Sequence, residues 1–216
     1  MLHIDRRSDI LAIIDVQPTF MPGGELPVPE GDQVVPGINF LLHERFEAAF
    51  ATQDWHPAGH SSFASAHPGA APYDTITMPY GNQILWPDHA LQGTPNAALH
   101  PDLAQDRVQM ILRKGANPAI DSYSAFREND QITSTGLAGW LRERGIQRLF
   151  FCGLATDFCV GWSALHAVDH GFEAVLIEDA SRGIGIAAPD GSNSLDATRR
   201  SLTDRGVTIL TTADLS

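Results

Sequence analysis

Cysteine is scarce in this chain of 216 residues, which contains only Cys152 and Cys159. Two thiols cannot build the disulfide framework of a small secreted protein, so we expect a protein of the reducing cytoplasm. Cys152 lies inside a short apolar run, where a buried thiol behaves as a small hydrophobic residue. Cys159 lies at the start of an expected helix and needs a different explanation.

Basic residues and long apolar runs are also scarce. The chain has 14 lysine and arginine residues against 26 aspartate and glutamate residues, which gives a formal net charge of -12 at pH 7. Because the basic residues are scattered, we expect neither nucleic acid nor an anionic membrane as partner, and a small neutral substrate fits better. No apolar run approaches the roughly 18 residues of a membrane span. Asp15 interrupts the first run, so we expect no secretion signal.

Short apolar runs alternate with helical patterns along the chain. The expected strands cover residues 10–14, 48–52, 108–112, 149–152, 174–177 and 207–210, and the expected helices cover residues 34–46, 137–141, 160–168 and 194–204. This alternation predicts the α/β class, with one domain over residues 1–216 and three α/β/α layers around a mostly parallel six-stranded sheet. Residues 54–105 break the pattern, and a loop region of that length in a compact domain indicates a binding site.

Chemically capable side chains follow four of the expected strands. Asp15, Asp54 and Lys114 come just after three of them, and Cys159 follows the fourth after a turn. Ligands of open α/β sheets bind outside the carboxyl ends of the strands, so we expect these four groups to meet there. Helix N-terminal amides and a nearby cation favour a thiolate. Cys159 is therefore the candidate nucleophile, with Asp15 as base and Lys114 as cation.

A candidate metal site lies in the long loop region. Asp54 and His56 alternate along an extended segment, so both can face one ion, and His60 and His89 add two imidazoles. A zinc-like ion binds carboxylate oxygen and imidazole nitrogen at about 2.0 to 2.2 Å. The spacing alone leaves open the alternative that these are solvated loop residues.

Five short motifs occur in the order found in one known family. They are Asp15-Val16-Gln17, Asp54-Trp55-His56-Pro57, Trp86-Pro87-Asp88-His89, Lys114-Gly115 and Ala155-Thr156-Asp157-Phe158-Cys159-Val160. Together they resemble the nicotinamidases (pyrazinamidases) of the isochorismatase-like cysteine hydrolases, over residues 9–210. The resemblance implies the isochorismatase-like fold with its Rossmann-like topology. The chain departs from the family pattern at Pro18-Thr19 and at Ala90, and the first difference concerns the shape of the entry loop.

The resemblance also implies a role for each matching residue. The family's catalytic triad falls on Asp15, Lys114 and Cys159, and its metal ligands fall on Asp54, His56 and His89, with His60 at a position that ligates in some members only. The oxyanion hole falls on the backbone amides of Ala155 and Cys159, after a cis peptide bond between Leu154 and Ala155. The walls of the substrate pocket fall on Phe20, Trp86 and Tyr123. One divalent ion is implied, with Zn²⁺ as first choice and Fe²⁺ or Mn²⁺ accepting the same ligands.

The implied reaction is hydrolysis of an aromatic carboxamide. Nicotinamide, and with it pyrazinamide, would be converted to the carboxylic acid and ammonia through a thioester on Cys159, in the service of NAD salvage. The alternative is a related cysteine hydrolase that acts on a ureido or carbamoyl amide. The Asp54, His56 and His89 set beside Trp86 favours the pyridine amide.

Two other patterns lead to weaker hypotheses. Residues 183–188 match the Gly-x-Gly-x-x-Ala fingerprint of dinucleotide sites, but Pro189 breaks the helix that would receive a pyrophosphate. His166 and His170 are four residues apart on an expected helix, but no carboxylate accompanies them as in a His-Glu-x-x-His site. The helix surfaces leave the formation of a homo-oligomer open.

Overall fold

A six-stranded parallel sheet forms the centre of the computed structural model, which describes residues 1–188 and 191–216. Every pairing between neighbouring strands of this sheet is parallel. Strands β1 (Asp9–Ile14) and β2 (Ala49–Asp54) are buried along their whole length, as strands covered on both faces should be. The predicted six-stranded sheet is therefore confirmed. In spatial order the strands are β5 (Met110–Lys114), β2 (Ala49–Asp54), β1 (Asp9–Ile14), β6 (Arg148–Leu154), β7 (Glu173–Arg182) and β8 (Thr208–Leu210).

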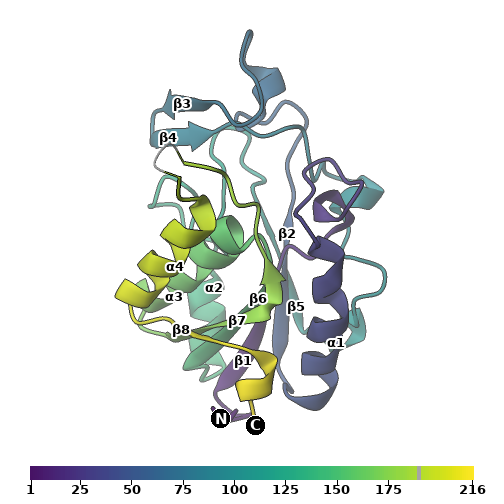
Figure 1. Ribbon diagram of the computed structural model, residues 1–216, viewed down its shortest axis with the longest axis vertical. Helices are drawn as coiled ribbons and strands as arrows, with labels where there is room; N and C mark the ends of the chain where they lie inside the picture. Colours follow the sequence, from purple (N-terminus) through teal and green to yellow (C-terminus); the bar gives the residue numbers. More distant parts are fainter. Residues whose placement is uncertain (189–190) are drawn as a thin grey trace.

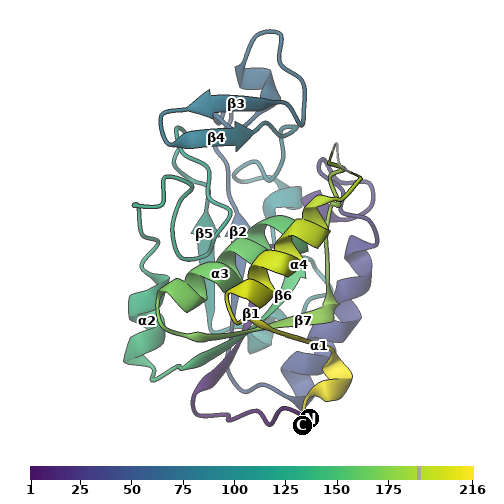
Figure 2. The ribbon, with the colours of Figure 1, turned by 60° about the vertical axis from the view of Figure 1, so that its left-hand side comes forward.

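Helices cover both faces of this sheet, as Figures 1 and 2 show from two sides. One face carries α1 (Val34–Glu44), and the other carries α2 (Leu137–Glu143), α3 (Gly161–Asp169) and α4 (Ser194–Asp204). The helices bury side chains that recur at helical spacing, which is why these segments pack against the sheet. The predicted three layers are confirmed. None of the helices in the described part of the chain is long and apolar enough to cross a membrane.

The loop region between β2 and β5 contains a small antiparallel hairpin, β3 (Thr75–Met78) with β4 (Gly81–Ile84). Figures 1 and 2 show this hairpin at the end of the molecule opposite the two chain termini. The sequence analysis expected only loop here. The hairpin was missed because its strands are short and largely exposed, so they carry no buried apolar run.

The chain passes from β6 to α3 through an unusual turn. Gly153 has a φ of 108°, and a Cβ atom there would lie 2.2 Å from the carbonyl oxygen of Ile14, so only glycine lets β6 approach β1 this closely. The peptide bond Leu154–Ala155 is cis, as predicted. Thr156–Val160 then form one wide π-helical turn before α3 begins. Cys159 lies in this turn, which continues directly into α3, so its predicted place at the start of the helix is confirmed.

His166 is a buried histidine of α3 that takes no part in a metal group. Its Nδ1 atom has no hydrogen-bond partner among the residues that the structure describes. Burial, reinforced by Arg127 and opposed by Asp169, lowers the pKa of His166 to about 4. No candidate metal group in the described residues contains His166 or His170. The ring packs edge-on against Trp162, with centroids 5.6 Å apart.

We expect the free energy of unfolding to fall as the pH is lowered from 6.5 to about 4. Across this range the unfolded chain binds a proton at His166 that the folded chain does not, so stability rises with pH and is lost on acidification. Replacing the ring in His166→Gln should reduce this loss by up to about 3 kcal/mol, because a change of one unit in pKa corresponds to about 1.4 kcal/mol. Urea unfolding at a series of pH values measures the difference. The exposed His43→Gln serves as control, and equal pH slopes in all three proteins would refute the assignment.

Candidate active site

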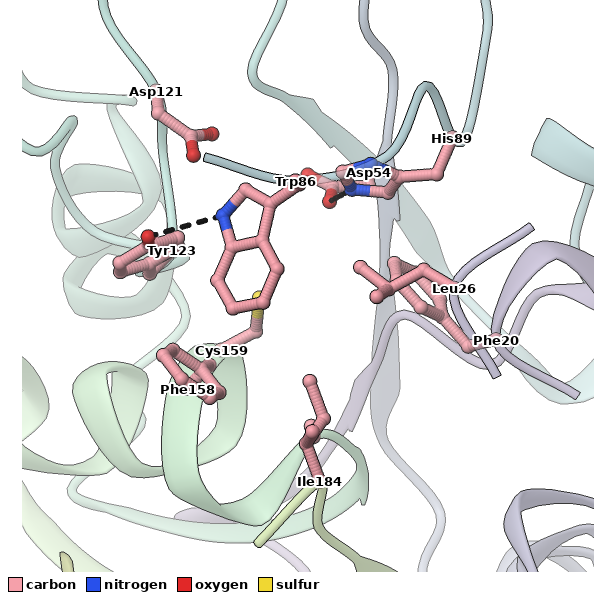
Figure 3. A pocket seen from close by; sticks show the side chains of 11 residues that line it. Phe20, Leu26, Asp54, Trp86, His89, Asp121, Tyr123, Phe158, Cys159 and Ile184 are labelled. Atoms are coloured by element: carbon pink, nitrogen blue, oxygen red, sulfur yellow. Dashed lines mark hydrogen bonds and ion pairs between the residues drawn. The ribbon is translucent and has the colours of Figure 1, made fainter. Parts of the chain in front are cut away.

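An aromatic pocket opens beyond the carboxyl ends of the central strands (Figure 3). The space within this pocket and at its mouth is about 340 Å³. The polar side chains in its lining are Asp54, His89, Asp121 and Cys159. Acidic, basic and nucleophilic groups therefore share one cavity with aromatic walls. The apolar and aromatic side chains of the lining are Phe20, Leu26, Trp86, Tyr123, Ala155, Phe158 and Ile184.

The three predicted wall residues all line this pocket. Trp86 packs edge-on against Phe158, with ring centroids 4.9 Å apart, and its Nε1 donates a hydrogen bond of 3.1 Å to the hydroxyl of Tyr123. Phe20 packs edge-on against His89, with centroids 5.6 Å apart. Sequence reasoning missed Phe158 as a wall, although its place directly before Cys159 was an available signal.

Lys114 is at the centre of the polar cluster and is the single lysine of the chain. Its side chain is fully buried. The Nζ atom forms an ion pair of 2.8 Å with Asp15 and donates hydrogen bonds of 2.8 Å to Asp54, 2.9 Å to the carbonyl oxygen of Ser122 and 3.3 Å to Cys159 Sγ. The strand order explains this meeting, because β5 pairs with β2 so that Lys114 lies opposite Asp54, and β1 and β6 follow. The predicted base, cation and nucleophile are thus in one cluster.

Asp15 is fixed in place by a side chain that the sequence analysis missed. The Thr52 hydroxyl donates a hydrogen bond of 2.6 Å to Asp15 Oδ1 and accepts one of 3.1 Å from the Asp15 amide. Carboxylate oxygens of Asp15 and Asp54 and the Cys159 sulfur all lie within 4.8 Å of one another. Asp15 is therefore close enough to exchange a proton with Cys159 once a substrate adjusts the geometry.

Burial and mutual charge set the protonation of this cluster. Burial alone would lower the pKa of Lys114, but Asp15, Asp54 and Cys159 raise it well above its usual value. Burial would raise the pKa of Asp54, yet Lys114 and His56 hold it well below its ordinary range. Burial raises the pKa of Asp15 in spite of Lys114. Burial also raises the pKa of Cys159 well above its usual value, with Lys114 opposing and both carboxylates reinforcing. Burial thus favours the thiol form of Cys159, so the sulfur needs a base such as Asp15 to lose its proton.

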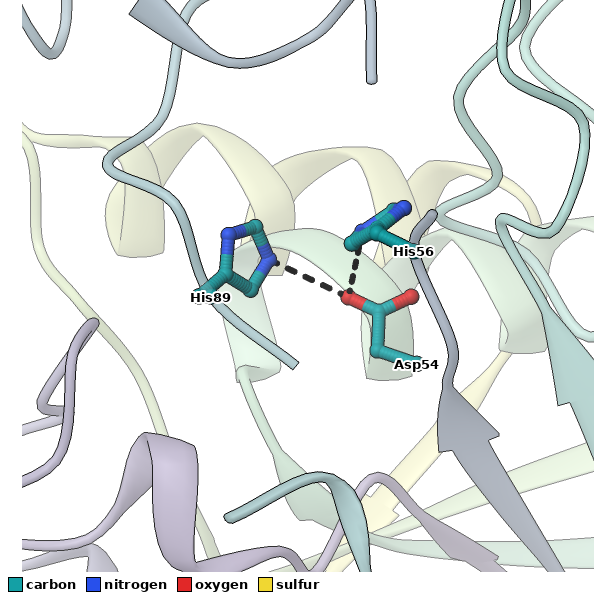
Figure 4. A group of neighbouring side chains, drawn as sticks. All are labelled: Asp54, His56 and His89. Carbon is teal, nitrogen blue, oxygen red and sulfur yellow. Dashed lines mark hydrogen bonds and ion pairs between the residues drawn. The ribbon is translucent and has the colours of Figure 1, made fainter. Parts of the chain in front are cut away.

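The predicted metal ligands Asp54, His56 and His89 converge (Figure 4). Asp54 Oδ2 lies 3.3 Å from Nε2 of His56 and 3.3 Å from Nε2 of His89. A zinc ion with tetrahedral bonds of about 2.0 to 2.1 Å holds its ligand atoms about 3.3 Å apart, so this spacing fits one shared ion. The carbonyl oxygens of Gly115 and Pro87 accept hydrogen bonds from the Nδ1 atoms of His56 and His89, which directs both Nε2 atoms to the same point.

His60 lies beside this trio and outside it. Its ring centroid is 4.4 Å from that of His56, and within the described residues its Nε2 has no hydrogen-bond partner. His56, His60 and Asp121 form a second group whose ligand atoms lie within 4.8 Å of one another. Sequence reasoning gave no signal for Asp121. Ligation by His60 stays a prediction.

Gln17 holds the backbone of Asp54 and was not assigned a role from sequence. Its Nε2 donates to the carbonyl oxygens of Asp54 and Ala97, at 2.9 and 2.8 Å, and its Oε1 accepts from the Asp54 amide at 2.8 Å. Gln17 is fully buried. Gln17, three residues after the end of β1, thus fixes Asp54, the last residue of β2 and a member of the trio.

Comparisons with known proteins show which proteins this chain is similar to. Residues 9–214 match the isochorismatase domain. A nicotinamidase of Acinetobacter baylyi is 52% identical over 176 residues, which cover 82% of each chain. The structure of an Acinetobacter baumanii nicotinamidase and pyrazinamidase matches with a TM-score of 0.92 and 47% identity over 96% of this chain and 98% of that one. A Pyrococcus horikoshii pyrazinamidase in complex with zinc matches with a TM-score of 0.72 and 34% identity, covering 94% of this chain and 99% of that one.

Gly115→Ala should weaken metal binding, although Gly115 is not itself one of the predicted ligands. A Cβ atom at Gly115, where φ is 67°, would lie 2.4 Å from Cε1 and 2.7 Å from Nδ1 of His56, so the imidazole must move. We expect Zn²⁺ affinity to fall by about 10- to 100-fold, as when a group that orients a ligand is lost. Competition with a chromophoric chelator measures it. Gly139→Ala, where a Cβ meets nothing within 4 Å, is the control, and equal affinity in both variants would count against the trio as a metal site.

Lys114→Met should destabilise the fold itself. The substitution leaves Asp15 and Asp54 buried beside each other without their cation, and removing one partner of a buried ion pair costs about 3 to 5 kcal/mol. Urea unfolding measures the loss. The neighbouring exposed Arg113→Met removes a cation of the same strand and should cost under about 1 kcal/mol. Similar losses in the two variants would show that the buried charge is not the cause.

Proposed function

The chain belongs to the isochorismatase domain family, and on this basis we propose that it is a nicotinamidase. It hydrolyses nicotinamide, and with it pyrazinamide, to the carboxylic acid and ammonia. The observation that carries the proposal is the meeting of Asp15, Lys114 and Cys159 beside the trio of metal-type ligands in one aromatic pocket. The 52% identical Acinetobacter baylyi relative, which carries the name nicotinamidase, supports the substrate.

In the proposed first half-reaction Cys159 is the nucleophile. Because the thiol is protonated at rest, Asp15 accepts its proton as sulfur attacks the carboxamide carbon. The tetrahedral oxyanion would accept hydrogen bonds from the amides of Ala155 and Cys159, both of which line the pocket, and one such donor contributes about 3 kcal/mol. Asp15 then gives the proton to the departing ammonia, and a thioester remains on Cys159.

In the second half-reaction a water molecule replaces the thioester. Asp15, again ionised, takes a proton from the water as its oxygen attacks the acyl carbon, and that proton returns to the departing Cys159 sulfur. The second proton of the water stays on the carboxyl group of the product and is then released to solvent, so the product leaves as its anion. Lys114 is protonated throughout, because its pKa is raised well above the usual value by the groups around it, and it keeps Asp15 within reach of the sulfur.

We further propose that Asp54, His56 and His89 hold one divalent ion, with His60 as a candidate additional ligand. When bound, such an ion supplies a Lewis acid for a ring nitrogen and for water. Zn²⁺ is the first choice, supported by the zinc complex of the Pyrococcus horikoshii pyrazinamidase, and Fe²⁺ or Mn²⁺ accept the same ligands.

The shape and lining of the pocket support a planar, neutral aromatic amide. Phe20, Trp86 and Tyr123 offer ring faces and edges to a pyridine or pyrazine ring. A ureido or carbamoyl amide has no such ring to pack against them, so this alternative is not favoured. We also propose that residues 1–216 act as one hydrolase domain, in the cytoplasm and in NAD salvage, without nucleic acid as partner. A homo-oligomer is compatible with this function.

Release of ammonia from nicotinamide tests the function directly. We expect release by the zinc-loaded protein, a fall on chelation that added zinc reverses, and a loss of at least about 1000-fold in Cys159→Ala, where the nucleophile is missing. Cys152→Ala is the matched control, since this buried strand thiol lies outside the site and its loss should leave turnover nearly unchanged.

No ammonia from the wild-type protein at millimolar nicotinamide would overturn the substrate assignment, and ureido and carbamoyl amides would be tested next. Retained turnover in Cys159→Ala would instead overturn the thioester mechanism while leaving the substrate in place.

A further inference from the structure

Residues 183–188, the glycine-containing segment after β7, form one wall of the pocket. Residue Ile184 of this segment lines the cavity, and Figure 3 shows its side chain entering from the side opposite Asp54 and His89. Gly183 precedes it at a point where a Cβ atom would lie 2.4 Å from the Leu195 side chain. The segment therefore runs against α4. Among residues 183–188, only Ile184 lines the pocket.

A carboxylate of the nucleophile turn holds this segment. Asp157, which is buried and two residues before Cys159, accepts hydrogen bonds of 2.9 Å from the Ile184 amide and 2.8 Å from the Gly185 amide. The Ser194 hydroxyl donates to the same carboxylate and accepts a bond of 2.7 Å from the Ile186 amide. The position of Ile184 is thus set by the same turn that carries the nucleophile.

We propose that Ile184 determines which ring substituents the enzyme accepts, and that Asp157 and Ser194 are positioning residues for it. The inference rests on the proposed function. A substrate nitrogen faces the end of the pocket with Asp54 and His89, where the proposed metal ligands converge, and the carboxamide carbon must face Cys159. The ring edge formed by C4 and C5 then faces Ile184. A substituent at C4 also crowds the carboxamide, so C5 reports on Ile184 alone.

The test compares 5-methylnicotinamide with nicotinamide. In wild type the methyl group would collide with Ile184, so kcat/KM for the substituted amide is low. In Ile184→Ala we expect the ratio of kcat/KM, substituted over unsubstituted, to rise by about 10-fold or more, as one methyl group in a tight pocket discriminates by about 10- to 200-fold. Ile184→Val should give a smaller rise in the same direction, and it remains informative if the alanine variant does not fold.

Two controls separate a wall from a general loosening of the site. Ile186→Ala changes the same residue type two positions on, in a side chain that lines the neighbouring groove, and should leave the ratio unchanged. With 6-methylnicotinamide, whose methyl group lies beside the ring nitrogen, Ile184→Ala should also leave the ratio unchanged. A 5-methyl ratio that stays within twofold of wild type in both Ile184 variants, with nicotinamide turnover retained, would overturn the proposal.

The hydrogen bonds by which Asp157 and Ser194 position Ile184 have their own test. Ser194→Ala should raise KM for nicotinamide several-fold with a smaller change in kcat, and should shift the 5-methyl ratio in the same direction as Ile184→Ala. Ser194→Thr, which keeps a hydroxyl, should restore wild-type selectivity. Ser201→Ala removes another serine hydroxyl of α4 and is the matched control. A loss of stability in Ser194→Ala with unchanged selectivity would leave Ser194 a merely structural role.

The two levels of proposal can be told apart. A wild-type protein that releases no ammonia from nicotinamide contradicts the proposed function, and this is known before any variant is compared. A wild-type protein that hydrolyses nicotinamide, together with variants that do not change selectivity, contradicts only the role of Ile184.

Discussion

The buried ammonium group of Lys114 is the interaction on which the rest of the site depends. Within 3.3 Å it meets Asp15 just after β1, Asp54 at the end of β2 and Cys159 in the turn after β6. Burying an unpaired charge costs several kcal/mol, so neither carboxylate can be buried here without the cation and the cation cannot be buried without them. The strand order β5-β2-β1-β6 meets this requirement because it brings the carboxyl ends of these strands to one edge. As the chain has no other lysine, this charge has no substitute of its kind nearby.

Neutral side chains then orient the charged ones. Thr52 on β2 bonds to Asp15 after β1, and Gln17 after β1 bonds to Asp54 at the end of β2, so two neighbouring strand ends are tied together in both directions. A hydroxyl and an amide make these ties without adding charge to a cluster whose charges already constrain one another. Thr52 thus orients the carboxylate of Asp15, and Gln17 fixes the backbone from which the carboxylate of Asp54 extends.

The sequence predicted the groups whose chemistry is visible in one residue, and missed those whose role comes from a distant partner. Apolar runs revealed the strands, and the strand ends revealed Asp15 and Lys114. Thr52 gave no signal because it lies 37 residues from the carboxylate it orients. The sequence indicated that a helix end and Lys114 favour the thiolate of Cys159. Burial, which appears only in the folded chain, opposes them and raises the pKa of the thiol, and Asp15 and Asp54 reinforce this effect.

The glycine motif at residues 183–188 shows how one sequence signal can have two physical causes. In a dinucleotide site the glycines let a phosphate approach the amides at a helix N-terminus. Here the amides of Ile184 and Gly185 already donate to the carboxylate of Asp157, so the protein supplies its own anion. A phosphate could reach these amides only by displacing the buried carboxylate, whose oxygens lie 2.9 and 2.8 Å from the two amide nitrogens. Gly183 is small because Leu195 and Asp157 leave no space for a Cβ atom. The close approach of this segment to the nucleophile turn thus explains the glycines. The motif forms a wall of the pocket and leaves no room for a nucleotide.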